Sequence, residues 1–171
     1  MAYWLFSKKN SMKSLEIIIL AAGKGTRMKS SKPKIFHDLG GKQISDYVID
    51  ASFRLKPKRI HLVVNNQIKD NFKNYNNLNI VIQKKQNGTG DAIKSAIKSL
   101  EKDSVTLVLY GDVPLIKHKS ILNVSKIKTN TVNLLCFNKE ERNNYGKVIL
   151  GTDGLISQVI EQKELKKNEN Y

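Results

Sequence analysis

The chain has 171 residues, with 30 Lys or Arg against 15 Asp or Glu, so its formal net charge at neutral pH is +15. A hydrophobic content of 40% and a charged content of 26% are typical of a globular domain and exclude a disordered tail. No apolar run approaches the ~20 residues of a membrane-spanning helix, and the apolar start at residues 1–6 is shorter than the core of a signal peptide. We therefore expect a cytoplasmic protein without membrane contact.

The positive charge is almost entirely lysine and is spread along the chain. Arginine occurs only at Arg27, Arg54, Arg59 and Arg142. Specific nucleic-acid recognition relies on arginine forks and exposed aromatic side chains, and neither gathers in this sequence. Nucleic acid is therefore not the partner we expect. A basic nucleic-acid-binding module remains an alternative, and it predicts affinity for RNA or DNA that falls steeply with salt.

Neither the cysteine nor the histidines indicate a catalytic or metal centre. A single cysteine, Cys136, excludes an intrachain disulfide, and its apolar surroundings at residues 132–137 predict a buried thiol. His37, His61 and His118 do not stand at metal-ligand spacing, so we expect them to be structural or on the surface.

Apolar runs and helical periodicities alternate along the chain. In chain order we expect a strand at 15–20, a helix at 46–55, a strand at 59–64, a weaker helix at 68–75, strands at 78–82 and 104–110 around a helix at 91–100, a helix at 119–127, and strands at 131–137, 146–150 and 155–160. This alternation predicts an α/β fold with a doubly wound, mainly parallel sheet. Residues 1–14 form an N-terminal extension in this scheme, and residues 15–171 form one domain without a visible linker or repeat.

A turn rich in small residues follows the first predicted strand. It reads Leu20-Ala21-Ala22-Gly23-Lys24-Gly25-Thr26-Arg27-Met28, with Lys32-Pro33-Lys34 soon after. Such residues let backbone amides approach a nucleotide closely, and Arg27 and Lys34 supply cations where polyphosphate charge would lie. The string matches neither the dinucleotide fingerprint nor the phosphate-loop motif. A lone glycine turn would be an ordinary loop, but the whole string favours a nucleotide site.

The opening string resembles the signature of the sugar-nucleotide pyrophosphorylases, a nucleotidyltransferase superfamily. Further segments resemble those of bacterial N-acetylglucosamine-1-phosphate uridylyltransferases, in the same order and spacing. These segments are 34–37 with 41–42 and 48–51, then 83–90, 110–116, 145–148 and 160–163. The resemblance runs from about residue 15 to 163 and implies the fold of the nucleotide-diphospho-sugar transferases.

The resemblance implies a role for residues in each segment. For substrate binding it implies Leu20, Ala21, Ala22, Gly23, Lys34, Gln83, Gly88, Thr89, Tyr110, Gly111, Asp112, Gly146 and Glu161. The turn and the Gln83 segment would hold uracil and ribose, and Gln83 has both a donor and an acceptor for the base edge. Gly146 and Glu161 would contact the sugar. Arg27, Lys34 and Asp112 are the implied catalytic residues, with Asp112 as the Mg²⁺ ligand.

Other interpretations of these residues remain open. Asp112 also suits a turn or a helix cap, Glu161 could be a solvated carboxylate, and Tyr110 could serve mainly in packing. Asp91 stands where the family more often has histidine.

The implied reaction joins UTP and N-acetylglucosamine 1-phosphate into UDP-N-acetylglucosamine, a peptidoglycan precursor, and releases pyrophosphate. Because the attacking phosphate is already anionic, this in-line reaction needs positioning and positive charge rather than a side-chain nucleophile. Mg²⁺ is the expected cofactor, and the two small molecules are the expected partners. A related cytidylyl- or guanylyltransferase is an alternative that shares the opening turn.

The family places further segments beyond the position of Tyr171. They include a sugar-binding asparagine, an asparagine partner for the Mg²⁺ site, the closing strands and, in bifunctional members, an acetyltransferase β-helix that forms trimers. We therefore expect a C-terminally truncated chain with an incomplete sheet, monomeric without the β-helix. A weak or inactive remnant that at most binds nucleotide is the corresponding alternative.

Overall fold

The computed structural model describes residues 5–6, 14–23, 25, 28–125, 131–138 and 145–160. The chain divides into two compact units. The larger unit spans residues 3–134, and the smaller one contains residues 135–171 together with residues 1–2. The sequence shows no linker at the boundary between residues 134 and 135.

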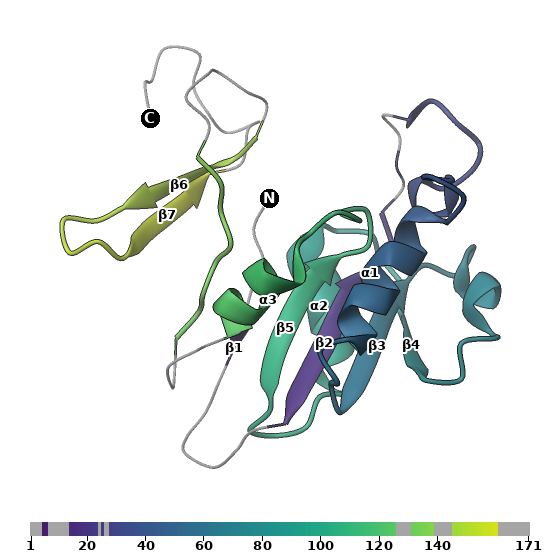
Figure 1. Cartoon of the computed structure of the whole chain (residues 1–171), viewed down its shortest axis with the longest axis horizontal. Helices are drawn as coiled ribbons and strands as arrows, with labels where there is room; N and C mark the ends of the chain where they lie inside the picture. Colours follow the sequence, from purple (N-terminus) through teal and green to yellow (C-terminus); the bar gives the residue numbers. More distant parts are fainter. Residues whose placement is uncertain are drawn as a thin grey trace. The chain divides into compact units, whose positions relative to one another are not determined.

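A five-stranded sheet in the order β1-β5-β2-β3-β4 forms the centre of the larger unit (Figure 1). Its parallel strands are β2 (Leu15–Leu20), β3 (Arg59–Val64), β4 (Leu78–Ile82) and β5 (Val105–Tyr110). From the expected N-terminal extension, β1 (Leu5–Phe6) pairs antiparallel with β5. The predicted mainly parallel α/β fold is thus confirmed.

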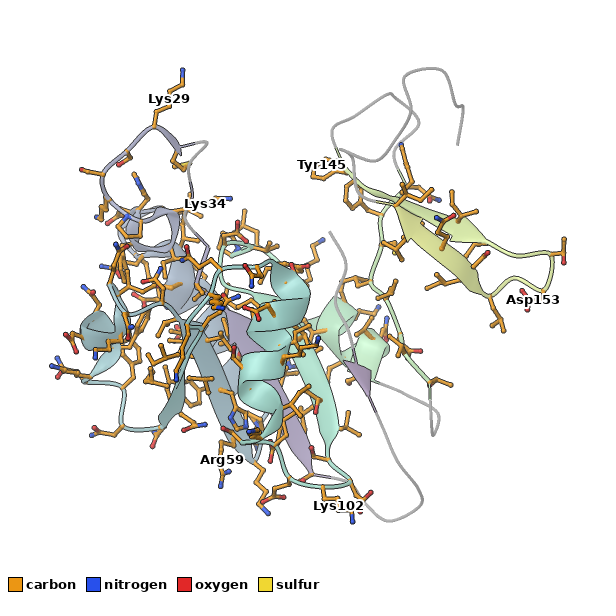
Figure 2. The ribbon with its side chains drawn as sticks, turned by 180° about the vertical axis from the view of Figure 1, so that it is seen from behind. Lys29, Lys34, Arg59, Lys102, Tyr145 and Asp153 are labelled. Atoms are coloured by element: carbon orange, nitrogen blue, oxygen red, sulfur yellow. The ribbon has the colours of Figure 1, made fainter. Side chains whose placement is uncertain are left out.

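Helices cover both faces of this sheet. α1 (Ile44–Phe53) connects β2 to β3, and α2 (Thr89–Ile97) connects β4 to β5 on the opposite face, as Figure 1 and the reverse view in Figure 2 show. Right-handed crossovers explain the two faces, since the chain runs from β2 outward to β4 and then returns to the other side of β2. The order of the strands therefore reverses between β2 and β5.

The inner strands are buried on both sides, which explains their continuous apolar sequences. Ile17, Ile18 and Ile19 of β2 are each 0% exposed, and Leu107 and Val108 of β5 are as well. Among the described residues, no helix is both long and apolar enough to cross a membrane.

Shorter elements complete the larger unit. The weak helix expected at 68–75 is a 3-10 turn, η3 (Lys69–Phe72), whose Phe72 ring packs 5.5 Å from that of Phe36. Phe36 ends a second 3-10 turn, η2 (Lys34–Phe36), and α3 (His118–Ser125) follows β5.

Tyr75 donates a 2.6 Å hydrogen bond to Asp46 of α1. Partial burial, together with this bond, raises the pKa of Tyr75 to about 12.

Two expectations for the segment after α3 are wrong. Residues 131–138 contain no strand, and Cys136 is exposed rather than buried. The β-prone residues of this segment need a neighbouring strand for their backbone hydrogen bonds. Within the described ranges no strand pairs with them.

In the smaller unit, β6 (Lys147–Leu150) and β7 (Ile156–Ile160) form an antiparallel hairpin, close to the two predicted strands. Its turn contains Gly154 at φ +74°, a left-handed conformation that glycine adopts without strain.

A polar network lies within the sheet of the larger unit. Glu16 and His61 are both fully buried, and Nε2 of His61 lies 2.9 Å from Oε2 of Glu16. Asn79 lies 2.9 Å from Nδ1 of His61, and the Glu101 backbone N–H donates to Glu16 at 3.3 Å. His61 is therefore structural, one of the two expected outcomes, and each of the two fully buried side chains supplies one of the other's hydrogen-bond partners.

We predict that Glu16→Ala lowers the free energy of unfolding by about 3 kcal/mol, because it leaves the His61 ring buried without its partner. Urea denaturation measures the change. Glu16→Leu combined with His61→Leu should cost less than the sum of the two single variants, since neither of the two fully buried side chains then leaves the other without its partner. Asp70→Ala, which removes an exposed acid from a surface pair with Lys73, is the control and should cost under about 1 kcal/mol. Additive losses from the two leucine substitutions would contradict the coupling.

Candidate functional site

A cleft of about 370 Å³ opens at the carboxyl ends of the parallel strands. Its walls come from the turn after β2, from η2, from the loop between β4 and α2, and from the end of β5. The lining residues are Leu20, Ala21, Ala22, Gly23, Gly25, Lys34, Ile35, Gln83, Gln86, Gly88, Thr89, Ala92, Tyr110 and Asp112. The cleft thus lies at the topological switch point, where open α/β sheets bind ligands.

The structure brings most of the sequence-predicted site residues together in this cleft, and their roles remain predictions. Gly111 does not line the cleft but packs against Leu20 and Ala21, which do. Gly146 precedes β6 in the smaller unit, and Arg27 and Glu161 lie outside the described residues. Sequence reasoning did not single out Gly25, Ile35, Gln86 and Ala92. Gly25, Ile35 and Gln86 stand inside the family-like segments, whereas Ala92 resembles an ordinary core residue.

The turn after β2 and the end of β5 approach each other closely at Gly111. Its N–H donates a 2.9 Å hydrogen bond to the Leu20 carbonyl. A Cβ at this position would lie 3.1 Å from the Leu20 oxygen and 3.3 Å from Cβ of Ala21. Glycine therefore allows the two strand ends that carry the turn and Asp112 to meet.

Side chains from two neighbouring loops fix the turn from the other side. The Ala22 carbonyl accepts a hydrogen bond from Nε2 of Gln86 at 2.6 Å and another from Nδ2 of Asn65 at 3.3 Å. These bonds join the loops that follow β2, β3 and β4. Because this carbonyl already accepts two hydrogen bonds within the protein, it is a poor acceptor for a ligand.

Gln83 forms a buried polar group in the wall of the cleft, with only 5% of its surface exposed. Its amide nitrogen donates to Oδ2 of Asp91 at 2.7 Å and to the Gly88 carbonyl at 3.3 Å. Both partners are acceptors, so only the NH₂ end of the amide can face them. Of the donor and acceptor expected from the sequence, the acceptor is therefore the group left for a ligand.

Opposite charges meet at the rim of the cleft. Nζ of Lys34 lies 2.8 Å from Oδ2 of Asp112, and these side chains are 36% and 31% exposed. Figure 2 shows Lys34 near the end of the sheet opposite Arg59, which begins β3. A partly exposed pair of this kind adds little stability, so both charges can turn toward a ligand at small cost.

Asp112 is the only acidic side chain that lines the cleft within the described part of the chain, which contains no group of three or more potential metal ligands. Proteins often hold Mg²⁺ through one or two carboxylates, with water and substrate phosphates completing its shell. The donor set therefore fits a magnesium ion that binds together with a phosphorylated substrate.

The sequence matches the family model of the MobA-like NTP transferase domain over residues 17–153. The chain belongs to this family. It is 43% identical over 157 residues to the bifunctional protein GlmU of Buchnera aphidicola subsp. Acyrthosiphon pisum, which covers 90% of the chain and 34% of that protein. GlmU of Saccharophagus degradans is 38% identical over 88% of the chain and 34% of its own length. This nucleotidyltransferase domain thus spans about a third of the length of these relatives.

Solved structures support the fold. Rv0371c from Mycobacterium tuberculosis H37Rv matches 67% of the chain and 60% of its own at a TM-score of 0.58 and 12% identity. A nucleotidyl transferase from Methanothermobacter matches 66% of the chain and 57% of its own at a TM-score of 0.56 and 14% identity. At such low identity the likeness establishes the architecture alone.

We predict that Gly111→Val destabilises the nucleotidyltransferase domain by about 1–3 kcal/mol, because the added carbons press the turn away from β5. Thermal or urea unfolding measures this loss. Gly90→Ala is the matched control, since a Cβ there meets nothing within 4 Å and the backbone is already helical; it should be neutral or slightly stabilising. Equal stability of the two variants would contradict the close approach at Gly111.

Proposed function

We propose that this domain transfers the uridylyl group of UTP to N-acetylglucosamine 1-phosphate. The observation that carries the proposal is the convergence of three motifs on one cleft: the small-residue turn, the Gln83–Thr89 loop and the Lys34–Asp112 pair. The resemblance of the quoted segments to uridylyltransferases and the similarity to GlmU proteins support the choice of substrates.

The reaction follows from what the residues offer. An oxygen of the sugar phosphate forms a bond to the α-phosphorus of UTP, and the bond to the β-phosphate oxygen breaks, so pyrophosphate leaves. Lys34, released from Asp112, stabilises the negative charge of the departing group, and we assign Arg27 the same role. The base lies against Gln83 and Gly88, which positions the α-phosphorus for in-line attack. Gly146 and Glu161 contact the sugar in this proposal.

Asp112 holds Mg²⁺ in the proposed mechanism, and the ion supplies positive charge beside the triphosphate when bound. A Rv0371c structure that shares the fold, at a TM-score of 0.54 and 12% identity, was solved in complex with manganese. That finding supports a divalent cation as the class of cofactor, and the choice of magnesium belongs to the proposal.

The test is a pyrophosphate-release assay with the full chain, Mg²⁺ and UTP, in the presence and absence of N-acetylglucosamine 1-phosphate. We expect release only with the sugar phosphate, and UTP to exceed CTP and GTP as the donor. Preference for another nucleotide would favour the related cytidylyl- or guanylyltransferase. If the chain bound no nucleotide and released no pyrophosphate with any combination of substrates, the proposed function would be overturned.

We predict that Lys34→Ala slows pyrophosphate release by about 10²–10³-fold, because it removes a positive charge placed beside the leaving group. Its thermal stability should stay close to that of the parent, since the side chain is partly exposed. Lys32→Ala removes an exposed lysine two residues away and should retain parental turnover. Equal rates for Lys34→Ala and the parent would remove Lys34 from the mechanism.

We further predict that Asp112→Asn raises the Mg²⁺ concentration for half-maximal activity by about tenfold, because a neutral amide is a poorer ligand for a hard cation. A magnesium titration of the initial rate measures this change. Asp70→Asn, which neutralises an exposed acid outside the cleft, should leave the titration unchanged. A parental magnesium dependence in Asp112→Asn would contradict the proposed ligand.

A further inference from the structure

The buried amide of Gln83 has a fixed direction. Its nitrogen faces two acceptors, Asp91 Oδ2 at 2.7 Å and the Gly88 carbonyl at 3.3 Å. A reversed amide would place its oxygen against both of them, so the chemistry of the partners excludes that orientation. Within the described part of the chain, no residue donates a hydrogen bond to Oε1 of Gln83. The wall of the cleft at Gln83 therefore offers a hydrogen-bond acceptor to a ligand.

Asp91 is the stronger of the two groups that impose this direction. Its hydrogen bond is the shorter one, and a carboxylate acceptor makes a stronger bond than a neutral carbonyl. Asp91 stands in the first turn of α2, where the partial positive charge of the helix N-terminus favours an anionic side chain. A carboxylate can only accept and so excludes a reversed amide by itself, whereas a histidine or an asparagine at this position can accept or donate and leaves the exclusion to the Gly88 carbonyl.

We propose that Asp91 is a positioning residue that sets the nucleobase preference of the cleft by holding Oε1 of Gln83 toward the ligand. Uracil carries an N–H at ring position 3 that can donate to this oxygen. Cytosine has an acceptor at the same position, so two acceptors would face each other without a shared proton. The inference rests on the proposed function, because it takes the ligand of this cleft to be a pyrimidine nucleotide.

A buried acceptor left without a donor weakens binding by roughly 10–100-fold. We therefore expect the parent chain to bind UTP at least about tenfold more tightly than CTP. The ratio of the two affinities, measured on one preparation, is the informative quantity, because any loss of folded protein or any general damage to the cleft affects both nucleotides alike.

Two substitutions of Asp91 separate its role as an acceptor from its charge. Asp91→Asn and Asp91→Leu remove the same negative charge and have similar volumes, but only asparagine keeps an oxygen that can accept from Gln83. We expect Asp91→Asn to retain most of the preference for UTP. In Asp91→Leu the affinity for UTP should exceed that for CTP by no more than about threefold. The longer hydrogen bond to the Gly88 carbonyl accounts for this residual preference. Lys94→Ala, an exposed change on the same helix, is the control and should match the parent.

Isothermal titration of the full chain with UTP and with CTP, each with Mg²⁺, is the measurement. Similar ratios for Asp91→Asn and Asp91→Leu, whether retained or lost in both, would overturn the positioning role. Equal affinities of the parent for UTP and CTP would overturn it as well. That result would still agree with a nucleotidyltransferase that accepts more than one nucleotide. A parent that binds neither nucleotide would overturn the proposed function, and this inference with it.

Discussion

The parallel pairing of β2 with β5 is the contact on which the rest of the cleft depends. In its register, Leu20 lies beside Tyr110, so both strands end at the same level. The glycine turn then begins beside Asp112, although more than 80 residues separate them in the sequence. Gly111 makes this approach possible because it has no side chain between the two strand ends. A shift in this register would move the loops that carry the basic and the acidic side chains apart, and the cleft would lose its arrangement of residues.

Hydrogen bonds between loops then turn a set of strand ends into a cleft with a defined lining. Gln86 and Asn65 meet on the Ala22 carbonyl, and Gln83 bridges to Asp91 at the start of α2. Each bond satisfies a polar group that would otherwise be costly to bury. The same bonds decide which donors and acceptors remain for a ligand. Preorganisation of this kind is what a reaction without a side-chain nucleophile requires, since its catalysis consists of position and charge.

The ion pair of Lys34 and Asp112 fits such a reaction. In the protein alone the two side chains neutralise each other at the rim of the cleft. In the proposed reaction, a triphosphate with its cation would offer each of them a more highly charged partner, phosphate for the lysine and metal for the carboxylate. On binding, each of the two side chains would exchange one oppositely charged partner for another, and neither charge would be left without a partner. The free-energy cost of the rearrangement is therefore low.

The sequence by itself determined the four parallel strands, the class of fold and the segments that carry the candidate site. These features are local: an apolar run followed by small residues is the same whatever the rest of the chain does. Element ends were less well determined, and α1 and α2 each begin two residues before the position that periodicity indicated. The segment 131–137 has the composition of a strand, yet it forms none, because a strand also needs a neighbour to bond with.

Only the tertiary structure decided how the site residues act on one another. Nothing in the local sequence pairs Lys34 with Asp112, buries Glu16 against His61, or joins Gln86 to Ala22. The sequence offers Gln83 as both a donor and an acceptor, but in the structure Asp91, in the first turn of α2, and the Gly88 carbonyl take its donor group, so only the acceptor remains for a ligand. The physical reason is that hydrogen bonds and ion pairs depend on distances of about 3 Å. For residues far apart in the chain, the strand pairing and the crossovers of the fold set those distances.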